Sequence, residues 1–205
     1  MKNLVGIMQG RLLPKYQGRY QAHPVGNWQE EFPLAKDIGL DCIEFILDYN
    51  DADINPLLKS GGVEEIQFMA EKTGIQVKTI CADYFMEAPM HIADSSVTEN
   101  SIAVMKTLLN SAAQLGVSDI VIPCVDQSSL NGKAEADRFE KVISSMLDLA
   151  ESNNINFSLE TDLAPEPFVK LIERFDSDRV TVNYDIGNSA ALGFNPIEEL
   201  DAYGD

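Results

Sequence analysis

Basic residues are scarce in this sequence, with 15 Lys and Arg against 33 Asp and Glu and a net charge of −18. Nucleic acids and anionic membranes bind to basic faces that neutralise phosphates, so the charge argues against both as partners. Long apolar runs are also lacking, and no stretch is long enough to span a bilayer. The chain opens with Met1-Lys-Asn-Leu-Val-Gly, without the apolar stretch of a signal peptide. We therefore expect a cytoplasmic protein.

Cysteine and histidine are nearly absent. Cys42, Cys81 and Cys124 are odd in number and lie in or at the end of different predicted strands, which favours buried thiols over disulfides. His23 and His91 are the only histidines. Low-complexity tracts are absent as well, and 45% of the residues are hydrophobic. These features predict one globular domain over residues 1–205.

Six strand-then-helix units follow one another at intervals of about 35 residues, as in a TIM barrel or a doubly wound sheet. The predicted strands are rich in Val, Ile and Phe without strict alternation, which is typical of parallel strands covered on both faces. They are Leu4–Gln9, Asp41–Leu47, Gln76–Cys81, Asp119–Cys124, Asn156–Glu160 and Val180–Asp185.

Amphipathic stretches between the strands predict the helices. They are Trp28–Ile38, Val63–Thr73, Val97–Leu115, Ala134–Asn153, Pro165–Phe175 and Pro196–Tyr203. A complete eight-unit barrel needs about 250 residues. We therefore expect an α/β TIM barrel that is incomplete, with six of the eight units and a truncated C-terminus. The alternative is a complete chain that forms an open sheet.

Two carboxylates, Glu160 and Asp185, each end a predicted strand. The carboxyl ends of parallel barrel strands surround one pocket, so acids placed there are candidates for cation ligands or an acid/base pair. The alternative is structural, because a carboxylate after a strand can also cap the next helix, and Asp185 precedes Ile-Gly-Asn.

Several short motifs, in their order along the chain, resemble the sugar phosphate isomerase/epimerase group of the xylose-isomerase-like TIM-barrel superfamily. The motifs are Gly6-Ile-Met-Gln-Gly-Arg-Leu, Trp28-Gln-Glu-Glu-Phe, Gly39-Leu-Asp-Cys-Ile-Glu-Phe, Ser158-Leu-Glu and Asn183-Tyr-Asp-Ile-Gly-Asn. The resemblance runs over the whole chain, and the order of the motifs is more specific than any one of them.

The resemblance implies a divalent metal bound by Glu160 and Asp185, with Glu160 also acting in proton transfer. The His and second Glu that complete such a site come from a seventh and an eighth strand, which this sequence does not contain. Removing a proton next to a sugar carbonyl gives an enediolate, so the chemistry needs a positioned base and a cation. A carboxylate-rich site with one His suits Mn²⁺, Mg²⁺ or Co²⁺ better than Zn²⁺.

Further residues are candidates for contact with substrate. Arg11 follows the first strand, where its guanidinium can bind a phosphate or carboxylate, and Gln9 lies beside it. Glu44 ends the second strand, with a salt bridge as the alternative. His91, like His23, falls in a predicted loop of the active face, where a hydrogen bond within the loop is the alternative.

Two residues later in the chain, Glu166 and Asn188, are candidates because ketose epimerases carry functional residues at the matching positions. Glu166 lies six residues after Glu160, a spacing found in ketose epimerases, although an acid at a helix start explains it as well. Asn188 stands where some ketose 3-epimerases have His, which argues against that subgroup.

The expected function is therefore a metal-dependent isomerase or epimerase of a small sugar or sugar phosphate. A sugar-binding protein of the same fold without catalysis is the main alternative. An endonuclease IV-like repair enzyme is disfavoured by the two histidines and the charge. Exposed edges on the first and sixth strands would also favour a homo-oligomer.

Overall fold

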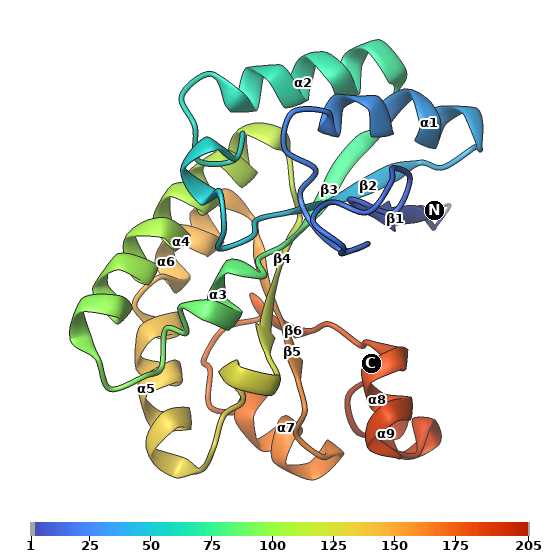
Figure 1. Ribbon diagram of the computed structural model, residues 1–205. Coiled ribbons are helices and arrows are strands. Elements are labelled where there is room, and N and C mark those ends of the chain that lie inside the picture. The colour runs from blue at the N-terminus through green and yellow to red at the C-terminus, as the bar shows by residue number, and fades with distance from the viewer. Residues whose placement is uncertain (1–2, 205) are drawn as a thin grey trace.

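The computed structural model describes residues 3–204, in which six parallel strands form one sheet in the order β1-β2-β3-β4-β5-β6 (Figure 1). The strands are β1 Gly6–Met8, β2 Cys42–Ile46, β3 Gln76–Cys81, β4 Asp119–Cys124, β5 Asn156–Thr161 and β6 Val180–Val182. A doubly wound sheet reverses its strand order at a switch point. Because the order here follows the sequence without reversal, the architecture is that of a barrel.

The sheet does not close on itself within the described residues, because β1 pairs only with β2 and β6 only with β5. The helices form an arc along one side of the sheet, from α1 through α4 to α7 (Figure 1). This arrangement confirms the expected incomplete barrel of six βα units.

Most helices lie where the apolar periodicity of the sequence predicts them. The longer ones are α1 Glu31–Asp37, α2 Gly62–Thr73, α4 Ser95–Leu115, α5 Lys133–Ser144, α6 Leu147–Asn153, α7 Pro165–Ile172, α8 Ile186–Leu192 and α9 Pro196–Tyr203. A single turn, α3, covers Tyr84–Glu87, and three 3₁₀ turns cover Trp28–Glu30, Ala52–Ile54 and Asp126–Ser128.

Four expectations need correction. The first and last strands are shorter than predicted, so Asp185 lies beyond β6 and not at its end. The single helix predicted over Ala134–Asn153 is two helices, because the chain turns at Ser145 and Met146. The helix predicted from Trp28 begins as a 3₁₀ turn. The sequence analysis also missed α8.

The two faces of the sheet differ in chemistry. Apolar residues between sheet and helices form the main core, which includes Phe32 of α1, Phe45 of β2 and Phe157 of β5. On the opposite, inner face, Ile46, Cys81 and Val121 occupy paired positions on neighbouring strands and form a separate small cluster. The row continues into polar residues, because Ser158 pairs with Val121 and its hydroxyl lies 2.9 Å from Thr181 Oγ1. The inner face is therefore increasingly polar towards β6.

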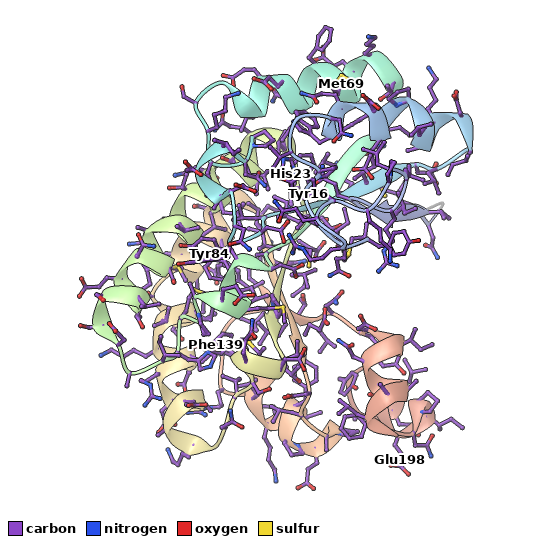
Figure 2. All side chains as sticks on the ribbon, viewed as in Figure 1. Tyr16, His23, Met69, Tyr84, Phe139 and Glu198 are labelled. Atoms are coloured by element: carbon purple, nitrogen blue, oxygen red, sulfur yellow. The ribbon has the colours of Figure 1, made fainter. Side chains whose placement is uncertain are left out.

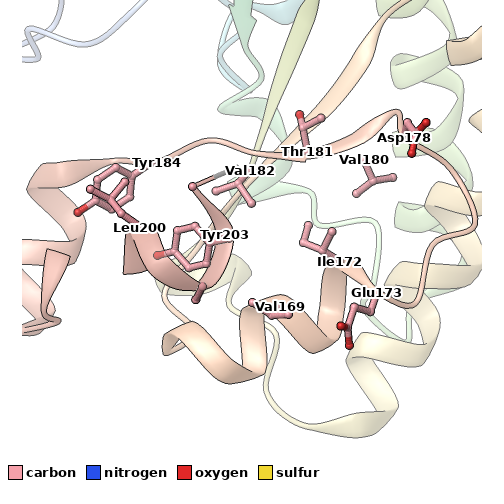
Figure 3. A pocket seen from close by; sticks show the side chains of 12 residues that line it. Val169, Ile172, Glu173, Asp178, Val180, Thr181, Val182, Tyr184, Leu200 and Tyr203 are labelled. Atoms are coloured by element: carbon pink, nitrogen blue, oxygen red, sulfur yellow. The ribbon is translucent and has the colours of Figure 1, made fainter. Parts of the chain in front are cut away.

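The free edge of β6 borders an apolar groove of about 610 Å³ between α7 and α9. Figure 3 shows Val180 and Val182 of β6, Ile172 of α7, and Leu200 and Tyr203 of α9 around this space. Leu200 is 53% exposed. This groove therefore places an apolar surface beside the open edge of the sheet.

All three cysteines are free thiols, and Cys81 and Cys124 are buried, in agreement with the sequence analysis. Among residues 3–204, the helices are all too short or too polar to cross a membrane.

Candidate active site

Glu160 is held at the carboxyl end of β5 by two carboxamides, one on each of its oxygens. Asn183, just after β6, donates from Nδ2 to Glu160 Oε2 at 2.9 Å. Asn188 of α8 donates from Nδ2 to Glu160 Oε1 at 2.6 Å. Carboxamides cannot neutralise a carboxylate, but they fix its orientation. Glu160 is therefore oriented while it keeps its capacity to take up a proton.

The environment of Glu160 raises its pKa to about 7. Burial is the main cause, because removal from water disfavours the charged form. The negative charge of Asp185 is the second cause, and the hydrogen bond from Asn183 acts in the opposite direction. A carboxyl group with a pKa near neutrality can both accept and return a proton at physiological pH.

Asp185 is the N-cap of α8. Its Oδ1 accepts hydrogen bonds from the backbone N–H groups of Gly187 at 2.6 Å and Asn188 at 2.9 Å. The cap uses only one of the two oxygens, and the side chain remains exposed at the mouth of the inner face. Asp185 thus caps a helix, as the structural alternative predicted, and the cap is compatible with a ligand role for Oδ2.

Further acids extend from Glu160 across the inner face. The charges of Asp83 and Glu44 both contribute to the raised pKa of Glu160. Burial raises the pKa of Glu44 and of Asp83, and the negative charge of Asp83 raises the pKa of Glu44 further. Glu44 lies in β2 and has no ion pair among residues 3–204. The acids therefore give this end of the sheet a negative potential.

Gln9 is fully buried, beneath the loop that follows β1. Its Oε1 accepts from Ile46 N at 3.0 Å and from His23 Nδ1 at 3.1 Å, while Nε2 has no partner among the described residues. Burial lowers the pKa of His23 to about 4, so the ring is neutral. His23 is 3% exposed, and its ring lies 5.5 Å from that of Phe45, measured between centroids. Gln9 and His23 thus anchor the loop, and they do not face open solvent.

The same loop carries Arg11 towards the acids. Arg11 donates to Gln21 Oε1 at 3.3 Å, and Gln21 Nε2 donates in turn to Asp83 Oδ2 at 3.3 Å. Arg19 pairs with the buried Asp48 at 2.9 Å, and the second Asp48 oxygen accepts from His23 N. These bonds hold an exposed guanidinium at the rim of the inner face.

Glu31 was missed by the sequence analysis. It is buried at the start of α1, where its Oε1 accepts from Gly10 N at 2.7 Å and from Leu12 N at 3.3 Å. Its Oε2 has no partner among residues 3–204, and burial raises the pKa of this carboxyl to about 7. Glu31 therefore fixes the turn that presents Arg11.

His91 and Glu166 lie in surroundings that favour their structural interpretations. His91 is buried, with its ring 6.0 Å from that of Phe139 in α5, and its carbonyl accepts from Arg138 Nε at 2.5 Å. Glu166 lies in the first turn of α7 and pairs with Lys170 at 2.5 Å, with 80% of its side chain exposed. Neither is among the named causes of the raised Glu160 pKa.

The oxygen donors of Glu160 and Asp185 fit part of a site for a hard divalent cation. A cation between them would relieve the repulsion that raises the pKa of Glu160. Among residues 3–204, no three His, Cys, Asp or Glu side chains are grouped so that they could hold a metal ion. The described residues thus contain two carboxylates that suit a cation and no complete set of ligands.

The sequence weakly indicates that two further residues, Asn183 and Asp83, belong to this site. Asn183 stands two residues before Asp185 in the stretch predicted as the end of the sixth strand, where residues two apart would share a face. Asp83 stands two residues beyond Cys81, at the end of β3. Their amide and acid types fit an inner-face position, but the bonds to Glu160 and Gln21 depend on how strands and loops meet.

Comparisons with known proteins find sugar epimerases both by sequence and by structure. In sequence, SgbU of Haemophilus influenzae, provisionally named an L-ribulose-5-phosphate 3-epimerase, is 26% identical over 183 residues, or 84% of this chain. The chain spans 63% of the length of SgbU. In structure, the 3-keto-D-glucoside 4-epimerase YcjR of E. coli has a TM-score of 0.74 at 16% identity, covering 99% of this chain and 77% of YcjR.

Two structural neighbours contain metals. A Mycobacterium smegmatis protein in complex with magnesium has a TM-score of 0.69 at 19% identity, covering 97% of this chain and 71% of its own. The IOLI protein, with a bound zinc atom, has a TM-score of 0.71 at 16% identity, covering 96% and 67%. The family described as xylose isomerase-like TIM barrel matches residues 32–205. The chain therefore belongs to the xylose isomerase-like TIM barrel family.

Proposed function

We propose that this chain forms the larger part of a divalent-metal-dependent epimerase or isomerase of a sugar or sugar phosphate. The observation that carries the proposal is Glu160, which two carboxamides orient beside a second carboxylate. Such a group suits reversible proton transfer at neutral pH. The name of SgbU supports a ketose 5-phosphate as the substrate class and a 3-epimerase as the reaction, against the expectation drawn from Asn188.

In this proposal, Glu160 takes a proton from the carbon next to the substrate carbonyl and an enediolate results. In an isomerase Glu160 returns the proton to the neighbouring carbon, whereas in an epimerase a second acid, the Glu that the family resemblance places on a further strand, would donate a proton to the opposite face. Asn183 and Asn188 keep the carboxylate aimed while Glu160 transfers its proton, because each holds one oxygen. This arrangement accounts for a base that acts without changing its position.

Glu160 and Asp185 would hold the metal, which supplies a positive charge that polarises the substrate oxygens and lowers the cost of the enediolate. The carboxylate donors favour Mg²⁺, Mn²⁺ or Co²⁺ over Zn²⁺. The magnesium and zinc in related structures support a divalent cation without selecting one. The remaining ligands, a His and a Glu by the family resemblance, would come from two further strands.

Arg11 is proposed to bind the phosphate of the substrate. The guanidinium is exposed, and its bond to Gln21 is long enough, at 3.3 Å, to be exchanged for a charge-assisted bond to phosphate. The surrounding acids would repel a phosphate elsewhere on the rim. Arg11 is thus the most suitable of the described cations.

The proposed activity is that of a closed barrel, formed by residues 1–205 as one domain together with a segment that supplies the two further strands. The experiment therefore uses the longest open reading frame that contains these residues. Exchange of solvent deuterium into C3 of L-ribulose 5-phosphate, followed by ¹H NMR with Mn²⁺ present, reports proton transfer directly. We expect exchange with the unaltered protein and a loss of at least about 100-fold in Glu160→Gln.

The matched control is Asp201→Asn, which neutralises an exposed acid of α9. Exchange at the unaltered rate in Glu160→Gln would contradict the role given to Glu160. No exchange with a panel of ketoses and ketose phosphates would contradict catalysis altogether. The second candidate, a sugar-binding protein without catalysis, is favoured by the use of Asp185 as a helix cap, and it predicts sugar binding without exchange.

A further inference from the structure

A buried carboxylate, Glu199, lies behind the proposed site and outside it. Its side chain is 1% exposed and accepts three hydroxyl hydrogen bonds. Oε1 accepts from Ser189 at 2.7 Å and from Tyr203 at 2.9 Å, and Oε2 accepts from Tyr184 at 3.1 Å. No cation pairs with Glu199 among the described residues. A carboxylate buried in this way is costly unless hydrogen bonds satisfy it, so the three hydroxyls are needed together.

The three hydroxyls come from three different places. Tyr184 directly follows the end of β6, Ser189 lies in α8, and Tyr203 lies in α9 with Glu199 itself. The ring of Tyr203 also contacts that of Phe168 in α7, at 5.2 Å between centroids. Glu199 thus ties α8 to the strand end on one side and, through α9, to the body of the protein on the other.

Helix α8 depends on such ties because it has no buried residue of its own. Its large apolar side chains, Ile186 and Leu192, are 69% and 48% exposed. The helix is seven residues long, too short to be stable by itself. Polar bonds therefore fix its position: the Asp185 cap, the bond from Ser189 to Glu199 and the bond from Asn188 to Glu160.

The residue that reaches Glu160 is next in sequence to the residue held by Glu199. Asn188 donates to Glu160 Oε1, and Ser189 donates to Glu199 Oε1. We propose that Glu199 is a positioning residue, which fixes α8 through Ser189 so that the Asn188 carboxamide stays on Glu160 and Asp185 stays beside it. The importance of this for catalysis rests on the proposed function, whereas the coupling itself does not.

The test uses side-chain amide resonances of the 205-residue chain in ¹H–¹⁵N NMR spectra. Asn183 and Asn188 both donate to Glu160, but only Asn188 lies on α8. We expect Glu199→Met and Ser189→Ala to move the Asn188 amide signals to the positions of solvent-exposed carboxamides, while those of Asn183 stay. Glu199→Gln, which keeps an acceptor oxygen for Ser189, is expected to restore most of the Asn188 shift.

The matched control is Glu198→Met, which alters the neighbouring acid of α9. Figure 2 shows Glu198 at the outer end of the helix, pointing away from the molecule. We expect this variant to leave both amides unchanged. Ser189→Ala guards against unfolding, because it removes the link without leaving the carboxylate bare. Unchanged Asn188 signals in Ser189→Ala would overturn the proposal.

A second readout links positioning to chemistry in the longest open reading frame. We expect Ser189→Ala to lower kcat for deuterium exchange about 10-fold with KM nearly unchanged, because a misaligned base affects the chemical step more than binding. A rise in KM alone would contradict positioning of the base. If the proposed function is wrong, the NMR result still stands, so the two failures are distinguishable.

Discussion

At the scale of single residues, Glu160 and Asp185 act on each other through charge. Neutralising Asp185 removes the second largest cause of the raised Glu160 pKa, so Asp185→Asn is expected to bring that pKa down from about 7 towards the ordinary value of a glutamate. Asn caps helices as well as Asp does, so α8 should persist. ¹³C NMR titration of the Glu160 carboxyl measures the shift.

The control for this titration is Asp201→Asn, whose charge is not among the causes of the Glu160 shift. An unchanged Glu160 pKa in Asp185→Asn would show that the two groups do not interact, and the shared cation site would lose its support. An equal drop of the Glu160 pKa in both variants would assign the effect to the net charge of the chain alone.

Glu31 predicts a pH dependence of stability. Its pKa is about 7 in the folded protein and about 4.5 unfolded, so between these values the folded state binds more protons. Stability therefore falls as the pH rises from 4.5 to 7, by an amount on the order of 2 kcal/mol. Glu31→Gln keeps an oxygen for the Gly10 and Leu12 amides and removes the charge.

We therefore expect Glu31→Gln to be more stable than the unaltered chain at pH 8 and to flatten this dependence. Urea unfolding at pH 5 and pH 8 measures both effects. A variant that is less stable at pH 8 would show that the unpaired Oε2 has a partner that matters more than the charge.

Residue types allowed some of the site to be predicted. Glu160 was a candidate because it ends an apolar strand, and Asn188 because of the comparison with ketose 3-epimerases, and the structure brings the two into contact. The burial of Gln9, the turn held by Glu31 and the hydroxyls around Glu199 could not be found. Each of these depends on contacts between segments far apart in the sequence, such as the 21 residues between Gly10 and Glu31.

At the scale of elements, the start of α2 shows two different demands for glycine. A Cβ at Gly62 would lie 2.2 Å from the carbonyl oxygen of Pro56, so the backbone itself would have to move. At Gly61 there is open space, but φ is +77°, which disfavours other residues. We expect Gly62→Ala to destabilise the chain by about 2 to 3 kcal/mol and Gly61→Ala by about 1 kcal/mol.

Chemical denaturation of the two variants beside the unaltered chain checks this order. Equal losses would mean that α2 can shift away from Pro56 without cost. A larger loss in Gly61→Ala would assign the sensitivity of this turn to backbone conformation and contradict the steric account.

Element boundaries followed the sequence where an apolar face repeats over many residues, as in α2 and α4. The boundaries differ from the predicted ones where tertiary contacts determine where a helix ends. The break between α5 and α6 has no Gly or Pro to mark it. Helix α8 was missed because its apolar residues face solvent, so it has no periodic apolar face to recognise.

At the scale of the whole molecule, the open edge of β6 and its apolar groove predict self-association of the 205-residue chain. We expect sedimentation velocity to show dimers or larger species that increase with concentration. Leu200→Lys, which puts a charge in the groove, should shift the chain towards monomer. A stable monomer at all concentrations would contradict the view that this edge needs a partner.

The control for this experiment is Phe68→Lys. Phe68 of α2 is 61% exposed, so the substitution adds the same charge to an apolar position far from β6 in the fold. Equal effects of the two substitutions would assign association to general hydrophobicity and not to the open edge.

The number of βα units predicted the partial barrel, and the choice between a barrel and a doubly wound sheet needed the strand order. Periodicity cannot supply that order, because both folds alternate strands and helices. The sequential order β1 to β6 decides for the barrel.

The most direct test of the central claim is a calorimetric Mn²⁺ titration of the longest open reading frame that contains these residues. The claim is that Glu160 and Asp185 together bind a divalent cation. We predict one binding site in the unaltered protein, unchanged in Asp201→Asn and weakened about 100-fold or more in the Glu160→Gln, Asp185→Asn double variant. Mn²⁺ binding of equal strength in the double variant would contradict the claim.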